Sequence, residues 1–292
     1  MTAEESPVPT PPHGGSAGLA RAESVAGGSA NAPRFPGRIV AALVGRDLRR
    51  FFRQPSRVVG SVAQPLILWV VLGAGMSGSF RLAGCGEVSY LSYFYPGIIV
   101  LTVLFTAIFS TISVIDDRHH GFLQAVLVAP VSRAALVLGK TLGGVAIALL
   151  QGLVLLLLAP LAGFQLAVID WPQVLGALAL AAIGFCALGF AMAWWIDSTQ
   201  GYHAVMSVAL IPLWMLSGAM FPPAPDSGWL RALMIADPMT YAVSAVRRAC
   251  AGGAIAAGVL PATSSAAVDL GVAALFAIAA VTAATALCRR RA

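Results

Sequence analysis

The tripeptide Gly139-Lys140-Thr141 is the part of this sequence that most resembles a nucleotide-binding motif. A phosphate-binding loop also needs a glycine five residues before its Gly-Lys-Thr, and Ala134 occupies that place. Such a loop follows a β-strand, whereas this tripeptide opens a long apolar segment. We therefore interpret Lys140 as a positive charge at a membrane interface and predict no nucleotide, cofactor or metal bound by this chain.

Asp116, Asp117, His119 and His120 offer side chains that could bind a metal. The two histidines are adjacent, however, and adjacent side chains diverge on a helix. A solvated polar loop is therefore the favoured interpretation of these four residues. The chain also contains no HExxH motif and no GxSxG serine within an apolar segment, so the catalytic parts of an intramembrane protease are missing.

The composition indicates a membrane protein. Charged residues make up 10% of the 292 residues and hydrophobic residues 59%, whereas soluble domains carry about 25% charged residues. The net charge of +6 is almost entirely arginine. An excess of positive charge in so apolar a chain is typical of membrane proteins, whose Lys and Arg residues orient the spanning helices. The sequence shows no soluble basic module that could bind nucleic acid.

Six long uncharged segments can each supply the roughly 20 apolar residues of a spanning helix. Residues 58–291 are therefore predicted to form an all-α, polytopic transmembrane domain. A disordered cytoplasmic tail over 1–35, without an apolar run long enough for a signal peptide, is expected to precede it. The expected spans are about 58–78, 92–115, 134–158, 172–196, 204–221 and 266–288.

Residues 36–57 predict an amphipathic helix that lies in the headgroup layer before the first span. Apolar residues recur there at helical spacing, while Arg46, Arg49, Arg50 and Arg53 lie mainly on the other side. An ordinary packed surface helix is the alternative.

The distribution of Lys and Arg predicts the orientation. Eight precede the first span, three lie around the turn from the second span to the third, and three end the chain. The richer side is cytoplasmic, so both termini are expected inside. The opposite side carries four: Arg81, Arg231, Arg247 and Arg248.

Residues 221–253 are too apolar for a plain loop, and Asp237 and Pro238 interrupt them too much for a span. A re-entrant helical hairpin between spans five and six fits better, and it must pack against the bundle because backbone at that depth needs burial. Cys85 and Cys250 would both lie outside, and a disulfide between them stays open because the sequence gives no geometry.

The segment between spans two and three predicts a short apolar helix on the cytoplasmic side. Such a helix could dock onto a soluble partner, although an interfacial helix that contacts only lipid is the alternative. The spans themselves hold almost no ionisable groups, so energy for any transport would come from a partner. Gly139 and Gly143, four residues apart, would allow a close helix approach. The candidate contact residues are Gly121, Phe122, Leu123, Val126, Leu127 and Pro130.

Three stretches, in this order, resemble the permease subunits of ABC-2 type exporters, in particular the group similar to the daunorubicin-resistance permease. The resemblance covers about residues 36–290. The stretches are Arg46-Asp47-Leu48-Arg49-Arg50 with Arg53-Gln54-Pro55, then Tyr95-Pro96-Gly97-Ile98 running into 121–133, and finally 216–222 followed by Asp237-Pro238-Met239-Thr240-Tyr241 and Arg247-Arg248.

This resemblance implies a multi-pass protein of a bacterial inner (plasma) membrane. It also implies that two permease chains, here expected as a homodimer, assemble with two copies of a separate ATPase, and that the ATPase binds ATP and Mg. It makes 121–130 the ATPase-coupling contact and implies no substrate-binding residues. Two departures stand out: Gln124 and Ala125 lie where relatives often carry an acidic residue, and Asp237 lies where they often carry Asn.

The expected function is export of a drug-like or amphipathic small molecule from the cytoplasm or inner leaflet. Export of a lipid-linked glycan or polysaccharide is the alternative within this class. A membrane scaffold or enzyme without transport is the alternative from another class.

Overall fold

The structure is a computed structural model that describes residues 36–76, 89–121, 133–221, 228–251 and 265–290. Within these ranges every regular element is a helix, which confirms the all-α prediction. The chain from Pro36 onward forms one compact unit, and the predicted tail over 1–35 lies outside the described residues. The helices are α2 (Pro36–Phe52), α3 (Pro55–Met76), α4 (Tyr90–Ser110), α5 (Ile112–His119), α7 (Arg133–Leu157), η2 (Ala159–Ala162), α8 (Trp171–Trp195), α9 (Thr199–Leu216), α10 (Gly228–Ala236), α11 (Pro238–Cys250) and α12 (Ala266–Arg290).

Five of the helices described are long and apolar enough to cross a membrane. The sixth predicted span falls on α9, which has 18 residues and a polar first turn, Thr199-Gln200-Gly201, and which is not among the five. The five candidate spans are Val58–Met76, Tyr90–His119, Ala135–Leu157, Trp171–Trp195 and Ala266–Cys288.

Helix α4 lies at the centre of the bundle. It packs against α3, α7, α8, α9 and α11, and α8 packs in turn against α12. By contrast, only 17% of the apolar window of α3 and 22% of that of α12 are buried within this chain. The exposed sides of α3 and α12 therefore need lipid or another protein to cover them.

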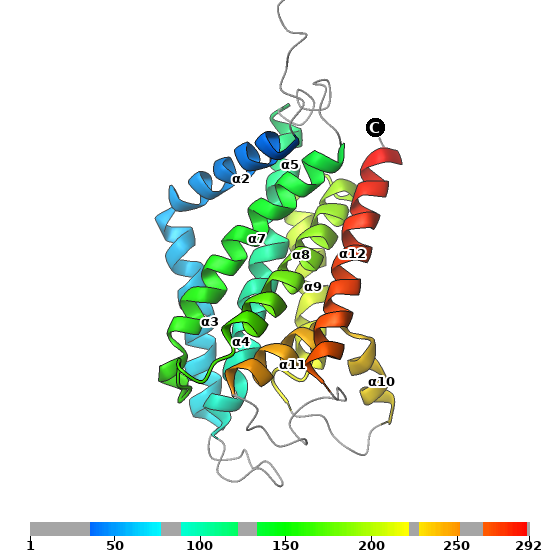
Figure 1. The fold of residues 1–292 in the computed structure, drawn as a ribbon. Coiled ribbons are helices and arrows are strands. Elements are labelled where there is room, and N and C mark those ends of the chain that lie inside the picture. The colour runs from blue at the N-terminus through cyan, green and yellow to red at the C-terminus, as the bar shows by residue number, and fades with distance from the viewer. Residues whose placement is uncertain (1–35, 77–88, 122–132, 222–227, 252–264, 291–292) are drawn as a thin grey trace, which may run out of the picture. The chain divides into compact units, whose positions relative to one another are not determined.

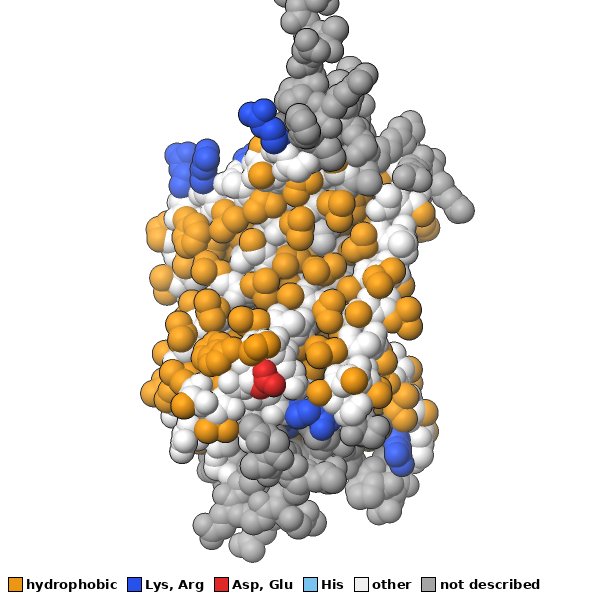
Figure 2. Space-filling view, in the orientation of Figure 1, with side chains coloured by type: hydrophobic (Ala, Val, Ile, Leu, Met, Phe, Trp, Pro, Cys, Tyr) orange, Lys and Arg blue, Asp and Glu red, His pale blue; other side chains and the backbone are white. Residues whose placement is uncertain are grey.

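The two ends of the bundle carry different elements. Helix α2 lies at the same end as the C-terminal end of α12, while α10 and α11 lie at the opposite end (Figure 1). Figure 2 shows hydrophobic side chains spread over the middle of the visible face, with lysine and arginine side chains toward its two ends. This banded distribution is the one expected of a protein surrounded by a bilayer.

Helix α2 ends earlier than predicted. The expected amphipathic helix ran over 36–57, but α2 ends at Phe52, and Pro55 opens α3. Proline has no backbone N–H and suits the first position of a new helix, which explains the break.

Helix α2 crosses α7 at the glycine pair Gly139 and Gly143, where we predicted a close helix approach. A Cβ on Gly139 would lie 2.6 Å from Leu43 Cδ1. Close approach of the two helices therefore depends on glycine at this position.

The predicted hairpin contains two helices that meet at Asp237. The Oδ1 atom of Asp237 accepts the Met239 N–H at 2.8 Å and so caps α11. Helix α11 is almost wholly buried and packs against α4, α8 and α12, whereas α10 is largely exposed. Cys250 is a buried free thiol, and Cys85 lies outside the described residues.

Candidate functional site

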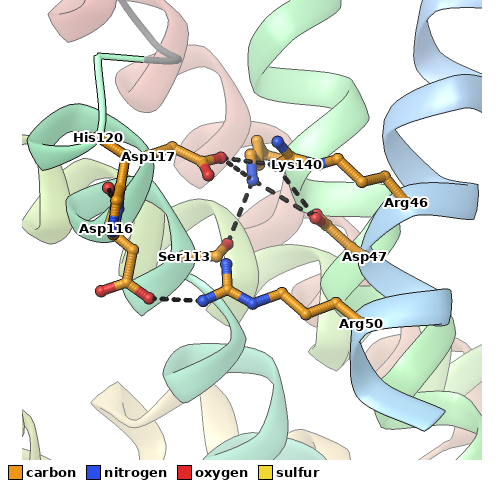
Figure 3. A network of polar contacts seen from close by, with 8 residues as sticks. All are labelled: Arg46, Asp47, Arg50, Ser113, Asp116, Asp117, His120 and Lys140. Atoms are coloured by element: carbon orange, nitrogen blue, oxygen red, sulfur yellow. Dashed lines mark hydrogen bonds and ion pairs between the residues drawn. The ribbon is translucent and has the colours of Figure 1, made fainter. Parts of the chain in front are cut away.

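A buried cluster of charged side chains joins three helices at the α2 end of the bundle (Figure 3). The Nζ atom of Lys140 lies 2.6 Å from Asp117 Oδ2 and 3.5 Å from Asp47 Oδ1, and it donates to Ser113 Oγ at 3.3 Å. The Arg46 guanidinium donates to the same Asp117 oxygen at 2.6 Å and to Asp47 at 3.3 Å. Two cations thus share two carboxylates, and the cluster is neutral overall.

The helices place these groups at both ends of one connection. Asp117 lies near the end of α5, and Lys140 lies two turns into α7, so residues 122–132 connect the two helices that carry them. Arg46 and Asp47 come from α2, which rests on Gly143, where a Cβ would lie 3.0 Å from Asp47 Oδ2. The cluster therefore ties both ends of this connection to α2.

The environment pairs the buried charges and favours the charged form of Arg46. The side chains of Lys140 and Asp117 are 2% and 9% exposed, and at such burial an unpaired charge would be costly. Burial disfavours the charged form of Arg46, but its hydrogen bond and attraction to Asp117, together with Asp47, outweigh this effect and raise its pKa above the usual value.

Lys140, which we predicted as an interfacial positive charge, is covered by carboxylates of α2 and α5. The four arginines of the predicted interfacial helix differ in their contacts. Arg46 and Arg50 contact Asp117 and Asp116, and Arg49 and Arg53 are exposed. The one sequence feature that could have indicated this ion-pair cluster was Asp47, an acidic residue within an arginine-rich helix.

Three of the four candidate metal ligands have separate partners. Asp116 pairs with Arg50 at 3.1 Å, Asp117 joins the buried cluster, and His120 Nδ1 lies 2.7 Å from the backbone oxygen of Asp116. Among the described residues, no group of three or more His, Cys, Asp or Glu side chains could hold a metal ion. Asp116, Asp117 and His119 lie in α5 rather than in a loop.

Of the six predicted coupling residues, the structure describes only Gly121. It follows α5 with a left-handed φ of +71°, a conformation that glycine adopts without strain, and its N–H donates to Arg118 O at 3.1 Å. The chain therefore turns sharply where the predicted coupling segment begins. Phe122, Leu123, Val126, Leu127 and Pro130 lie outside the described residues.

Two adjoining cavities lie beside the cluster. The smaller, about 310 Å³, includes the charged residues Asp47, Arg50 and Asp116 in its wall. The larger, about 640 Å³, is lined by residues of α2, α3, α4, α7 and α9. The two cavities adjoin, since they share five wall residues: Phe51, Phe109, Ser110, Ile147 and His203.

A chain of hydrogen bonds links three helices along the wall of the larger cavity. Gln151 of α7 donates through Nε2 to Ser61 Oγ of α3 at 2.7 Å, and its Oε1 accepts from Thr106 of α4. Sequence analysis assigned no residue to the larger cavity, because wall-facing and lipid-facing residues are equally apolar in these segments.

Comparison with known proteins places this architecture among transporters. Residues 39–250 match the family model described as ABC-2 type transporter. The chain is 29% identical over 211 residues to a protein named as transport permease ycf38 of Cyanophora paradoxa, covering 70% of this chain and 71% of the relative. It is 26% identical over 217 residues to the daunorubicin resistance ABC transporter permease protein DrrB1 of Streptomyces coeruleorubidus, covering 72% and 74%. Nodulation protein J of Neorhizobium galegae is 25% identical over 203 residues, covering 68% and 75%.

Proposed function

This chain belongs to the ABC-2 type transporter family, and we propose that it is the permease subunit of an ATP-driven exporter for a drug-like or amphipathic small molecule. The observation that carries this proposal is the charged cavity at the α2 end that adjoins a larger, mainly apolar one. A separate ATPase, in two copies, would bind ATP and Mg, and two copies of this chain would form the complete conduit.

Six crossings are the topology that we infer, because α9 runs antiparallel to α4 over nearly its whole length. Near its start, the Tyr202 hydroxyl lies 2.8 Å from Thr111 Oγ1, just after α4 ends. Near its end, the Trp214 indole donates to Gly97 O at 3.1 Å, close to where α4 begins. A helix that follows a spanning helix for this distance crosses the same thickness.

The α2 end is then the cytoplasmic side of a bacterial inner membrane, since it carries the arginine-rich helix and the end of α12, whose last two residues are Arg289 and Arg290. On this assignment α10 and α11 form the hairpin at the outer side, where α11 packs into the bundle. The charged cluster is then cytoplasmic, and residues 122–132 contact the ATPase. Movement of that contact would reach α2 through the Arg46–Asp117 ion pair.

The wall of the larger cavity favours an amphipathic small molecule over a glycan. A glycan has many hydroxyl groups, each of which needs a hydrogen-bond partner when it leaves water. This wall is mostly aromatic and aliphatic, including Phe105, Phe109, Ile211 and Trp214. Export of a lipid-linked glycan remains the alternative, and a scaffold without transport would need no such cavity.

The test is reconstitution in vesicles with the ATPase that co-purifies or is co-expressed with this chain. We expect ATP-dependent export of an amphipathic dye. Phe122→Asp should weaken ATPase binding by about 2 kcal/mol or more, because it replaces a predicted apolar anchor, whereas the conservative control Phe122→Leu should retain binding. A complex that forms normally with Phe122→Asp and exports the dye would contradict the coupling assignment, and absence of any ATP-dependent export would contradict the permease function.

A further inference from the structure

The larger cavity contrasts with the smaller one in the charge of its wall. Asp47, Arg50 and Asp116 line the smaller cavity. Among the side chains that the structure describes, no Asp, Glu, Lys or Arg lines the larger one, whose wall includes the His203 imidazole. Moving a permanent cation from the charged cavity into this wall would remove its solvent without supplying an opposite charge.

We propose that the larger cavity is a binding site for uncharged, ring-bearing amphipathic molecules with one or two hydrogen-bonding groups, and that it discriminates against permanent cations. This inference rests on the proposed export function and names its substrate class. A cavity of about 640 Å³ has the size of a site for a drug-sized molecule.

Rings in the wall supply the apolar surface for such a ligand. Phe51, Phe105 and Phe109 contribute phenyl rings, and Trp214 contributes an indole whose N–H already donates to Gly97 O. A ligand therefore meets the ring of Trp214 rather than a donor. The Phe109 ring is already in contact with Phe105 at 5.5 Å and with His203 at 4.7 Å between centroids. These contacts cover part of the Phe109 ring, so the discrimination against cations rests on the lack of a carboxylate among the described wall residues.

Two polar side chains in the wall are free to bind the ligand's polar group. Gln64 of α3 and Ser207 of α9 line the cavity, and neither makes a side-chain hydrogen bond to another part of the chain that the structure describes. Gln151 is different, because Ser61 and Thr106 already occupy its amide. An amide and a hydroxyl recognise neutral groups such as a carbonyl, hydroxyl or amide.

The experiment compares two fluorescent probes with the full chain in nanodiscs, as it purifies with its ATPase. One probe is a coumarin that carries a neutral primary amide, and the other is the same coumarin with a trimethylammonium group in that place. We expect the neutral probe to bind at least 10-fold more tightly. Gln64→Leu should weaken its binding about 2- to 10-fold, because one hydrogen bond is lost, and Ser207→Phe, which fills the cavity, should abolish it. The matched control Gln165→Leu changes an exposed glutamine outside the cavity and should have no effect.

The decisive variant is Gln64→Glu, which has nearly the same shape but adds a negative charge. It should reduce or reverse the preference for the neutral probe. Equal affinities for the two probes, or a ratio that Gln64→Glu leaves unchanged, would overturn the inference. An export assay in vesicles distinguishes this failure from failure of the proposed function. If both probes are exported alike, only the substrate class is refuted. If the probes bind as expected but no ATP-dependent export occurs, only the export function is refuted.

Discussion

Asp117 Oδ2 lies 2.6 Å from both Lys140 Nζ and a guanidinium nitrogen of Arg46, so one carboxylate oxygen joins α2, α5 and α7. The three residues are 71 and 23 positions apart in the sequence. Since residues 122–132 connect α5 and α7, this oxygen lies at the base of the proposed ATPase contact.

Removing the Lys140 charge should strongly destabilise the chain. Lys140→Met leaves Asp47 and Asp117 with Arg46 as the remaining cation of the cluster, and breaking a buried pair in this way costs about 3–5 kcal/mol. The double variant Lys140→Met with Asp117→Leu should recover part of the loss, because both members of the pair are then apolar. Reversible unfolding in mixed micelles measures both. The exposed Arg49→Met on α2 is the control, and a Lys140→Met variant as stable as that control would refute a structural role for the pair.

Gly144 should not tolerate even a methyl group. A Cβ there would lie 2.2 Å from Ser110 Oγ and 2.8 Å from Cys186 Sγ, so α7 could no longer approach α4 and α8 as closely. We expect Gly144→Ala to lower the free energy of unfolding by about 1–3 kcal/mol. The matched control is Gly176→Ala on α8, where a Cβ would meet nothing within 4 Å. That control should be neutral or slightly stabilising, as alanine is in a helix interior, and an equal loss in both variants would argue against the close contact.

Arg247 should be irreplaceable by lysine. Its guanidinium lies 4.2 Å from the Tyr93 ring centroid and donates to Gly218 O at 3.0 Å, so it holds the end of α9 against the start of α4. Lysine keeps the charge but cannot stack and donate in the same geometry. Arg247→Lys should cost about 1–3 kcal/mol, while Arg231→Lys on the exposed α10 should cost little. Both are measurable as shifts in thermal unfolding, and equal small shifts would contradict this role.

Asp237 should make stability depend on pH. Burial raises its pKa from 3.8 to about 7, although the hydrogen bond from the Met239 N–H opposes the shift. The folded state therefore binds the proton more tightly than the unfolded state, so this contribution is fully present below about pH 4 and is lost as pH rises through about 7. Asp237→Asn keeps an N-cap side chain without the charge.

The measurement is the thermal midpoint of the purified chain between pH 4 and pH 8. Wild type should lose stability across this range relative to Asp237→Asn, and the gap should be largest near pH 8. Asp170→Asn is the control, because Asp170 caps α8 in the same way but is exposed. Parallel curves for wild type and Asp237→Asn would show that the carboxyl is not protonated in the folded state.

The helical class, the amphipathic helix and the positions of the long apolar helices could be predicted from the sequence. These properties depend on composition and on periodicity within about 20 residues. The exceptions are local as well: α2 ends at Phe52 rather than at residue 57, and a break at Thr111 divides α4 from α5.

The candidate site could be predicted only in part. The arginine pattern placed the four arginines mainly on one side of the predicted helix, but it could not show that Arg46 and Arg50 turn toward Asp117 and Asp116. That choice depends on how α2 is rotated where it crosses α7.

The sequence by itself determined that this chain is an all-helical membrane protein with an arginine-rich end, because hydrophobicity and charge act through each segment separately. Only the tertiary structure decided that Lys140 is buried against Asp117 and that Gln64 and Ser207 line one cavity. Both results depend on which sides of separate helices face one another, and in segments that are apolar all round no pattern along the chain distinguishes those sides.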